Sequence, residues 1–167
     1  SMDFKEVDNL VLVIGKTEGH IDQSLFSRII LNEKNGPPPE VNLFNEKNNG
    51  ESLLSLIKKD YIKSAHDVSL GGILTAISKM CIKGNKGIKL EKSKNLINEI
   101  EYFFAEDQGR YLVEINQKDL KEVSQILDKN SVHHEKLGVI VDKDVIINEK
   151  TKVTIDELKA YNTNWLS

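Results

Sequence analysis

Residues 62–80 read IKSAHDVSLGGILTAISKM, and this stretch decides what kind of fold the chain adopts. The extended run Tyr61–Ala65 predicts a strand, and Leu70–Lys83 predicts a helix because its apolar residues recur with helical spacing. Ser69 is placed to cap the N-terminus of this helix, and Gly84 is placed to end it. The predicted apolar stripe of the helix consists of Leu70, Ile73, Leu74, Ile77, Met80 and Cys81.

The turn between this strand and this helix allows two interpretations. A helix N-terminus has backbone N–H groups without partners and a partial positive charge, so it attracts anions. Gly71 and Gly72 lack Cβ atoms, which lets a phosphate approach the backbone, and Ser69 can donate to a ligand oxygen. Asp67 is short enough to bind Mg²⁺, and His66 can donate to a phosphate. The residues alone leave open a phosphate or metal-phosphate site and a structural turn without a ligand.

The rest of the chain mixes short apolar runs with amphipathic stretches. Residues 35–39 (NGPPP) cannot be helical, and Thr154 with Glu157 has the spacing of a capping box. Strands mixed with helices predict an α/β fold with helices packed on the faces of a sheet. A hairpin over Asp142-Lys143 predicts that this sheet is mixed. The expected strands are residues 10–15, 61–65, 88–90, 111–115, 136–141 and 144–147, and the expected helices are 22–30, 44–59, 70–83, 96–100, 119–127 and 154–161.

The composition is that of a globular domain. The 167 residues are 39% hydrophobic and 29% charged, which is enough to bury a core. The net charge of −3 offers no basic surface to nucleic acid or to an anionic membrane. Because no long apolar run and no signal peptide is present, we expect a cytoplasmic protein. We interpret Ser1-Met2 as a tag scar and residues 3–167 as one domain cut from a longer chain.

Cysteine and histidine give no metal pattern. Cys81 is the single cysteine, which excludes an intrachain disulfide, and it lies on the apolar stripe, where a structural role is expected. His133 and His134 are adjacent, so their side chains diverge and do not easily chelate one ion. No cysteine, histidine and carboxylate set has the spacing of a zinc site.

A second polar cluster, residues 106–110 (EDQGR), precedes the apolar strand YLVEI. Its ionisable groups and amide at a strand entrance are able to bind a substrate. They are equally typical of a solvated turn with a weak surface ion pair, which is the interpretation that the residues alone favour.

Five segments together resemble one enzyme family. SAHDVSLGGI and FFAEDQGRYLVEI are similar to two signature segments of the phosphoribosylformylglycinamidine synthase family, the large synthetase subunit of purine synthesis. The other three resembling segments are GPPPEVNL, HHEKLGVIVDKDVII and TIDELKAYNTNWL. They occur in the family's order over residues 10–166, so the resemblance covers nearly the whole chain.

The resemblance implies a fold and an activity. Members of this family repeat a pair of domains, an N-type half and a C-type α/β half, and this chain resembles the second C-type half. The implied reaction is an ATP-dependent amidation. The amide oxygen of formylglycinamide ribonucleotide is phosphorylated, and ammonia from a glutaminase partner then displaces the phosphate. Mg²⁺ is expected to neutralise charge on the transferred phosphoryl group.

The resemblance also implies what this chain lacks. The family's active site lies in a cleft between N-type and C-type halves, and its catalytic histidine belongs to an N-type half. We therefore expect no catalytic residue in this chain and no activity from the chain alone. The implied partners are the missing N-type domains, the first C-type domain, a glutaminase subunit and the ribonucleotide.

The same resemblance names candidate site residues. The glycine-rich segment that faces the cleft corresponds to Ser64, His66, Asp67, Ser69, Gly71 and Gly72, and the second segment corresponds to Glu106, Gln108 and Arg110. Their expected role is to bind substrate or nucleotide phosphate, with Asp67 as the candidate metal ligand.

Two departures from the family pattern favour alternatives to that role. Leu70 stands where the family has an acidic residue, and Asp22-Gln23-Ser24 replaces a glycine-rich element. The alternatives are a scaffold or structural nucleotide-binding half, or a domain of another superfamily member such as selenophosphate synthetase.

Overall fold

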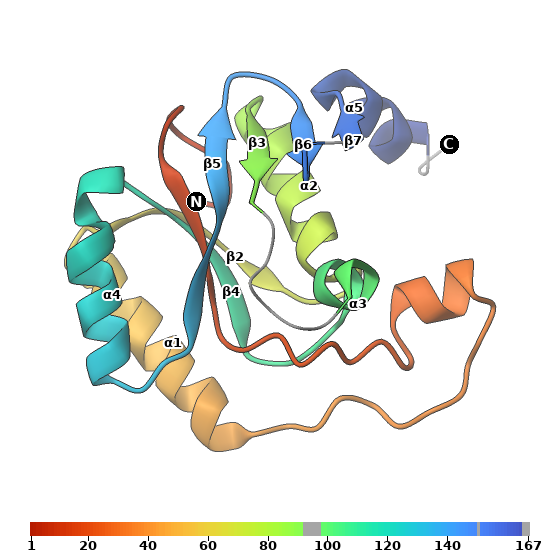
Figure 1. Cartoon of the computed structure of the whole chain (residues 1–167), viewed down its shortest axis with the longest axis horizontal. Helices are drawn as coiled ribbons and strands as arrows, with labels where there is room; N and C mark the ends of the chain where they lie inside the picture. Colours follow the sequence, from red (N-terminus) through yellow and green to blue (C-terminus); the bar gives the residue numbers. More distant parts are fainter. Residues whose placement is uncertain (92–97, 150, 165–167) are drawn as a thin grey trace.

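The computed structural model describes residues 1–91, 98–149 and 151–164. A mixed sheet of seven strands lies at its centre, in the order β2-β4-β1-β5-β3-β6-β7, which confirms the predicted α/β class (Figure 1). Neighbouring strands are antiparallel except β3 and β6, which are parallel. The strands are β1 (Leu10–Ile14), β2 (Ile62–Val68), β3 (Gly87–Leu90), β4 (Arg110–Ile115), β5 (His134–Val141), β6 (Val145–Ile147) and β7 (Thr151–Val153).

Helices cover both faces of the sheet (Figure 1). One face carries α1 (Leu43–Lys58) and α4 (Leu120–Lys129), and the other carries α2 (Gly72–Gly84) and α3 (Glu99–Phe104), with α5 (Ile155–Asn164) beside α2. Two short helices, η1 (Phe26–Ile30) and η2 (Gln117–Asp119), precede α1 and α4.

Strand β1 supplies both layers of the core. Its five residues, LVLVI, are all buried. Successive side chains of a strand point to opposite faces, so Leu10, Leu12 and Ile14 pack under α1 and α4. Val11 and Val13 pack under α2 and α3 on the other face. A run that is apolar at every position therefore becomes a central strand, with β4 on one side and β5 on the other.

The predicted hairpin over Asp142-Lys143 is wrong. β3 lies between β5 and β6, pairing antiparallel with the former and parallel with the latter. The connection therefore crosses the end of β3, and it passes so close to Gly87 that a Cβ atom there would lie 2.0 Å from the Asp144 carbonyl oxygen. The antiparallel partner of β6 is β7, a strand that the sequence pattern did not predict.

The ends of α2 also differ from the prediction. β2 continues through Val68, and the N-cap of α2 is Gly71, whose φ of 81° lies in the left-handed region and which has no side-chain cap. Ser69 contributes only its carbonyl oxygen, which accepts from the Gly72 N–H at 3.0 Å, so its predicted capping role is wrong. Gly84 is the last helical residue, and Asn85 is the left-handed C-cap.

The predicted stripe of α2 faces the core, with Leu74 only partly buried. Ile73, Ile77, Met80 and Cys81 are fully buried in the core between α2 and the sheet, and burial raises the pKa of the Cys81 thiol to about 12. Leu70 precedes the helix and is 62% exposed, so it does not belong to the stripe.

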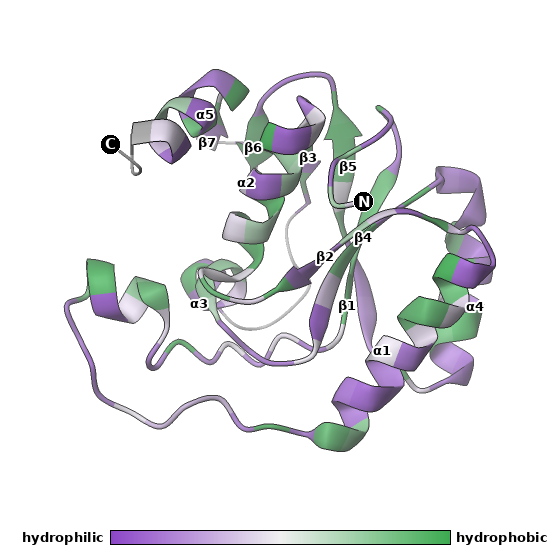
Figure 2. Ribbon diagram, turned by 180° about the vertical axis from the view of Figure 1, so that it is seen from behind, coloured by the Kyte–Doolittle hydropathy of each residue, from purple (hydrophilic) through white to green (hydrophobic). Residues whose placement is uncertain are grey.

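The helix predicted over residues 22–30 is largely wrong. Only η1 forms, a five-residue π-helical turn, and its Ile29 and Ile30 are 68% and 66% exposed. From η1 the chain continues without regular structure to α1 (Figure 1). We call residues 22–42 the arm. Figure 2 shows that η1 carries apolar residues.

The C-terminal capping box is confirmed. The Glu157 N–H donates to Thr154 Oγ1 at 3.1 Å, and the Thr154 N–H and hydroxyl both donate to the Glu157 carboxylate at 2.8 Å. These hydrogen bonds lower the pKa of Glu157. Part of the predicted helix 96–100, and Trp165 in the last resembling segment, lie outside the described residues. Within the described ranges, no helix combines the length and apolarity needed to cross a membrane.

Candidate functional site

The N-terminus of α2 already carries an anion, and that anion is a carboxylate of the chain itself. The Gly71 N–H donates to Glu106 Oε1 at 2.8 Å, and the Leu25 N–H donates to the same oxygen at 2.8 Å. The charge of Glu106 therefore lies where the helix dipole attracts a negative group. The two polar clusters that the sequence presents separately, HDVSLGG and EDQGR, thus meet at one point, and the arm joins them there.

The two glycines of the turn are required by the packing of the chain on itself. Gly71 has a φ of 81°, and a Cβ atom there would lie 2.2 Å from Thr75 Oγ1. Gly72 has a φ of 69°, and its Cβ atom would lie 2.6 Å from the Phe103 carbonyl oxygen and 2.8 Å from that of Ala105. The missing Cβ atoms let α2 approach the connection from α3 to β4.

His66 and Asp67 lie at the end of β2, just before this turn. His66 Nδ1 is 2.6 Å from the Asp67 carbonyl oxygen and 3.2 Å from Asp67 Oδ1. The His66 side chain is only 10% exposed, whereas the Asp67 side chain is 65% exposed. A shallow pocket of about 310 Å³ adjoins both residues and is otherwise mostly apolar, with Leu53 and Tyr111 in its wall. Asp67 is therefore the more accessible of the two side chains.

Arg110 is a buried internal clamp. Its guanidinium donates to the Ala105 carbonyl oxygen at 2.6 Å, to Thr17 Oγ1 at 3.0 Å and to the Asp107 carbonyl oxygen at 3.2 Å. Burial lowers the pKa of Arg110, and the nearby Asp107 carboxylate, 3.7 Å away, opposes this shift. The guanidinium stays charged because its ordinary pKa is far above neutral. The expectation of a solvated turn with a surface ion pair is thus wrong.

Asp107 extends this clamp to the loop after β1. Its carboxylate accepts from the backbone N–H groups of Glu18, Gly19 and His20 at 3.0–3.2 Å. Asp107 therefore fixes the loop that leads into the arm. The pattern of the sequence did not single out Asp107, because its three donors lie almost ninety residues earlier.

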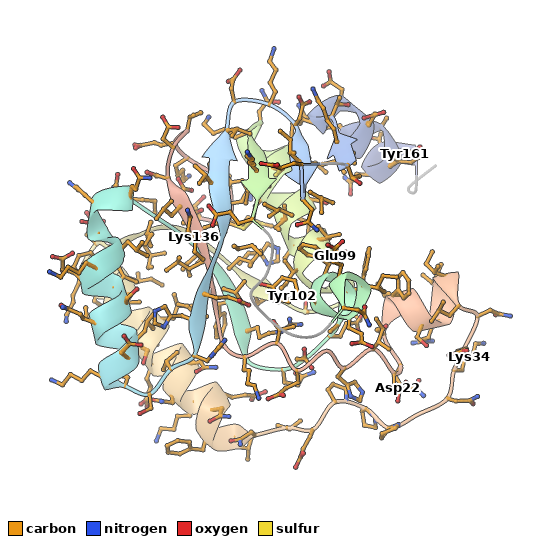
Figure 3. All side chains as sticks on the ribbon, in the orientation of Figure 1. Asp22, Lys34, Glu99, Tyr102, Lys136 and Tyr161 are labelled. Carbon is orange, nitrogen blue, oxygen red and sulfur yellow. The ribbon has the colours of Figure 1, made fainter. Side chains whose placement is uncertain are left out.

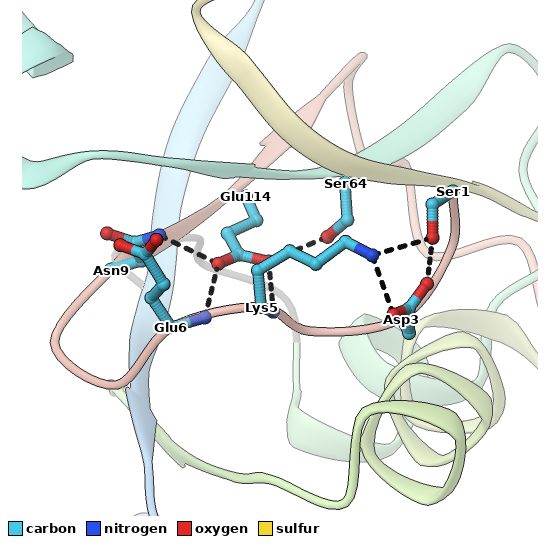
Figure 4. A network of polar contacts seen from close by, with 7 residues as sticks. All are labelled: Ser1, Asp3, Lys5, Glu6, Asn9, Ser64 and Glu114. Carbon is cyan, nitrogen blue, oxygen red and sulfur yellow. Dashed lines mark hydrogen bonds and ion pairs between the residues drawn. The ribbon is translucent and has the colours of Figure 1, made fainter.

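Ser64 belongs to a second buried clamp, which is centred on Glu114 and is shown in Figure 4. Its hydroxyl donates to Glu114 Oε2 at 2.8 Å, and both side chains are buried. The Glu114 carboxylate also accepts from the N–H groups of Lys5 and Glu6 at 2.9 and 3.0 Å and from Asn9 Nδ2 at 2.7 Å. Glu114 thereby holds the N-terminal segment against the sheet. The single acidic residue in the apolar run YLVEI was the signal that could have revealed it.

A larger polar cavity lies elsewhere, beside the C-terminal end of β1 and the start of α1. Its volume is about 580 Å³. Gln108 lines it, but Ser64, His66, Asp67, Ser69 and the glycine pair do not. The predicted site residues therefore divide between the α2 turn, the buried clamps and this cavity. The charged or ionisable side chains around the cavity are Lys16, Glu18, His20, Glu40, Glu46, Asp107 and His133.

A known protein family matches most of this chain. The family model for the C-terminal domain of AIR synthase related protein matches residues 6–148. The chain belongs to this family. The predicted resemblance is therefore confirmed at the level of the domain, and the match includes the arm, the α2 turn, Arg110 and Glu114.

Relatives of this AIR synthase-related domain are much longer proteins. The chain is 65% identical over 167 residues to the phosphoribosylformylglycinamidine synthase subunit PurL of Pelagibacter ubique. The aligned region covers 100% of this chain and 23% of that relative. It is 34% identical over 158 residues to the PurL of Bartonella henselae, covering 95% of the chain and 21% of that relative. The chain thus spans about a quarter of the length of the curated relatives it matches.

Solved structures share the fold of the domain. T. maritima PurL complexed with FGAR matches with a TM-score of 0.78 and 18% identity, covering 93% of this chain and 28% of that chain. The same protein complexed with ATP matches with a TM-score of 0.71 and 17% identity, over 93% and 26%. E. coli HypE, a hydrogenase maturation protein, matches with a TM-score of 0.68 and 15% identity, over 92% and 51%. One fold therefore serves proteins with different names.

At the end of β2, the AIR synthase-related domain offers one exposed carboxylate, that of Asp67. Among the residues that the structure describes, no three histidines, cysteines or carboxylates gather to hold a metal. Asp67 presents one exposed carboxylate, and Mg²⁺ is usually held by one or two carboxylates together with water and phosphate oxygens. At the α2 N-terminus, by contrast, an incoming phosphate meets the Glu106 carboxylate.

Proposed function

We propose that this chain is the second C-type domain of the large subunit of a phosphoribosylformylglycinamidine synthase. The observation that carries the proposal is the 65% identity over all 167 residues to a relative of that name. This identity favours the synthase over another superfamily member such as selenophosphate synthetase. Residues 3–167 are then one domain of a longer, cytoplasmic polypeptide.

The proposed activity belongs to that longer polypeptide. It converts formylglycinamide ribonucleotide to the amidine with ATP and with ammonia that a glutaminase subunit releases from glutamine. Support comes from similar folds in T. maritima PurL complexed with FGAR and with ATP, and in a structure of PurLQS from the same organism. The missing N-type and first C-type domains complete the site, and the chain by itself is inactive.

The contribution of this domain is a wall of the cleft formed by the end of β2 and the turn to α2. Asp67 is the residue that would hold Mg²⁺, which when bound neutralises charge on the transferred phosphoryl group. His66, held beside Asp67, and Ser69 are the remaining polar groups offered to the substrate or nucleotide. Glu106 keeps Gly71 and Leu25 in place behind this wall. Gln108 is offered to the polar cavity instead.

A scaffold role is the second candidate, and a specific observation favours it. Ser64, Glu106 and Arg110, which the resemblance placed in the site, all bind other groups of this chain. Leu70, where the family has an acidic residue, further reduces the polar character of the turn. In this alternative the domain supports a cleft that is not productive.

Kinetics of the complete synthase separate the two candidates. The double variant His66→Ala, Asp67→Ala is made in the full-length polypeptide and assayed with the glutaminase subunit, ATP and the ribonucleotide. A direct role predicts that kcat/KM falls about 100-fold, which is roughly 2.7 kcal/mol of transition-state stabilisation. A scaffold role predicts unchanged kcat/KM with a lower melting temperature. No turnover from the unmodified assembly would contradict the proposed reaction itself.

A further inference from the structure

Exposed apolar side chains are concentrated on the arm and on the first turn of α1. Twelve large hydrophobic residues in the described part of the chain are exposed, and six of them fall within residues 29–44. Two groups result, one on η1 and one where the arm enters α1. These residues are Ile29, Ile30, Leu31, Val41, Leu43 and Phe44.

The arm has a defined shape, so the exposure of these side chains does not come from an unstructured tail. Gln23 Nε2 donates to the carbonyl oxygens of Lys34 and Gly36 at 2.7 and 3.1 Å, which closes the loop on itself. The Glu33 N–H donates to the Ser27 carbonyl oxygen at 2.9 Å. Figure 3 shows the arm, on which Asp22 and Lys34 are labelled, apart from the sheet.

The arm is also attached to the domain, through contacts of Leu25, Phe26 and Pro37. The Leu25 N–H donates to Glu106, and the ring of Phe26 stacks on that of Phe104 with centroids 4.8 Å apart. His20 Nε2 lies 2.9 Å from the Pro37 carbonyl oxygen. These contacts orient η1 so that Phe26 faces the domain while Ile29 and Ile30 face outward. Such a surface is pre-organised for a partner and costs stability when it remains in water.

The occupant of this surface follows from the length of the relatives. The Pelagibacter relative matches this chain along all 167 residues, yet the chain covers only 23% of that relative. About three quarters of such a polypeptide therefore lies outside the chain and is covalently tied to it, so its effective concentration near the arm is high. No other partner has this advantage.

We propose that the arm is an interdomain docking element, and that the η1 surface formed by Ile29, Ile30 and Leu31 is covered by an apolar surface of the same polypeptide outside residues 1–167. This inference rests on the proposed function only in placing the chain within a longer synthase subunit. It does not require that the β2–α2 turn binds substrate.

Thiol labelling of the full-length polypeptide tests the proposal. Ile30→Cys is compared with Leu54→Cys, a matched control on α1 whose parent side chain is 56% exposed in the domain. Each labelling rate with a maleimide is divided by its rate in denaturant, and peptides are read by mass spectrometry. We expect Ile30→Cys to label at least about tenfold more slowly than the control, because thiol reactivity follows exposure. The buried Cys81, with its raised pKa, contributes little background.

Three outcomes would contradict the proposal, and the experiment distinguishes them from one another. Equal rates at the two positions would show that the arm stays in solvent and would overturn the proposal. Protection that disappears on dilution would assign the surface to a second copy, and protection that needs the glutaminase subunit would assign it to that partner. Either result also overturns it. If Ile30→Cys fails to fold, carbene footprinting of Ile29–Leu31 against Leu54 in the unmodified polypeptide gives the same comparison. Neither readout depends on turnover, so an inactive assembly does not affect them.

Discussion

Two regions, the β2–α2 turn and the arm, differ in which groups surround them. At the turn, the Glu106 carboxylate occupies the position where an anion is expected, and the glycines pack against neighbouring backbone. On the arm, Ile29 and Ile30 are the last two residues of η1, and most of their side-chain surface lies in water. The polar segment that suggested a ligand thus stabilises the domain, whereas the apolar segment that suggested a core helix faces outward.

This difference shows that one sequence motif is compatible with two structural roles. A glycine pair at a helix N-terminus suits a phosphate, and it also suits a carboxylate from the same chain. Apolar residues at helical spacing suit a core, and they also suit a surface that another domain covers. Sequence pattern specifies the kind of group that must be adjacent, and only the structure tells which group it is.

The largest expected effect comes from breaking the clamp behind the turn. Arg110→Met removes a buried guanidinium, which leaves the Ala105 carbonyl oxygen without its hydrogen bond and the Asp107 carboxylate without its ion-pair partner. Removing one partner of a buried ion pair costs about 3–5 kcal/mol. We expect urea denaturation of the 167-residue chain, followed by circular dichroism, to show a loss of this size. A loss below about 1 kcal/mol would mean that the clamp is solvated, as a surface pair is.

The next effect tests why the turn needs its glycines. Gly72→Ala combines a left-handed φ with a Cβ atom 2.6 Å from the Phe103 carbonyl oxygen, so we expect a loss of about 2–4 kcal/mol. Gly71→Ala is the matched control, because the three atoms nearest to its Cβ atom belong to the Thr75 side chain and not to the backbone. The control should lose about 1–2 kcal/mol, measured by the same denaturation. Equal losses at the two positions would argue against close packing of α2 on the α3–β4 connection.

Part of this picture could be predicted from the sequence. The apolar run of β1 and the stripe of α2 predicted buried elements because their periodicity reports which side chains face the core. The five resembling segments predicted the family, which the match over residues 6–148 confirms.

The remaining features depend on partners far away in the chain. Arg110 binds Thr17, and Glu114 binds Lys5, across about a hundred residues, so local polarity alone suggested a solvated turn. The sequence also does not reveal that β3 lies between β5 and β6. The alternation of apolar and polar residues does not specify which strand lies beside another. For the same reason, only the structure reveals that the predicted site residues are divided between two surfaces and two buried clamps.

A smaller effect sharpens the link between the turn and the arm. Glu106→Ala removes the acceptor for both Leu25 and Gly71, and we expect a loss of about 1.5–3 kcal/mol together with faster hydrogen exchange at both amides. Glu106→Gln keeps an oxygen but removes the charge, so it should lose about 0.3–1 kcal/mol from the helix dipole. Unchanged exchange at the Leu25 amide in the alanine variant would show that the arm is held by other contacts.

The smallest effect belongs to the arm itself. Ile30→Ser changes a side chain that is 66% exposed, so the stability of the 167-residue chain should change by less than about 0.5 kcal/mol. Ile73→Ala, a fully buried residue of the α2 stripe, should lose about 2–5 kcal/mol in the same denaturation and serves as the contrast. In the full-length polypeptide the serine variant should become clearly destabilising, because a covered isoleucine then loses its contacts. If Ile30→Ser already destabilised the domain alone, η1 would belong to the core, and the contrast between the arm and the turn would fail.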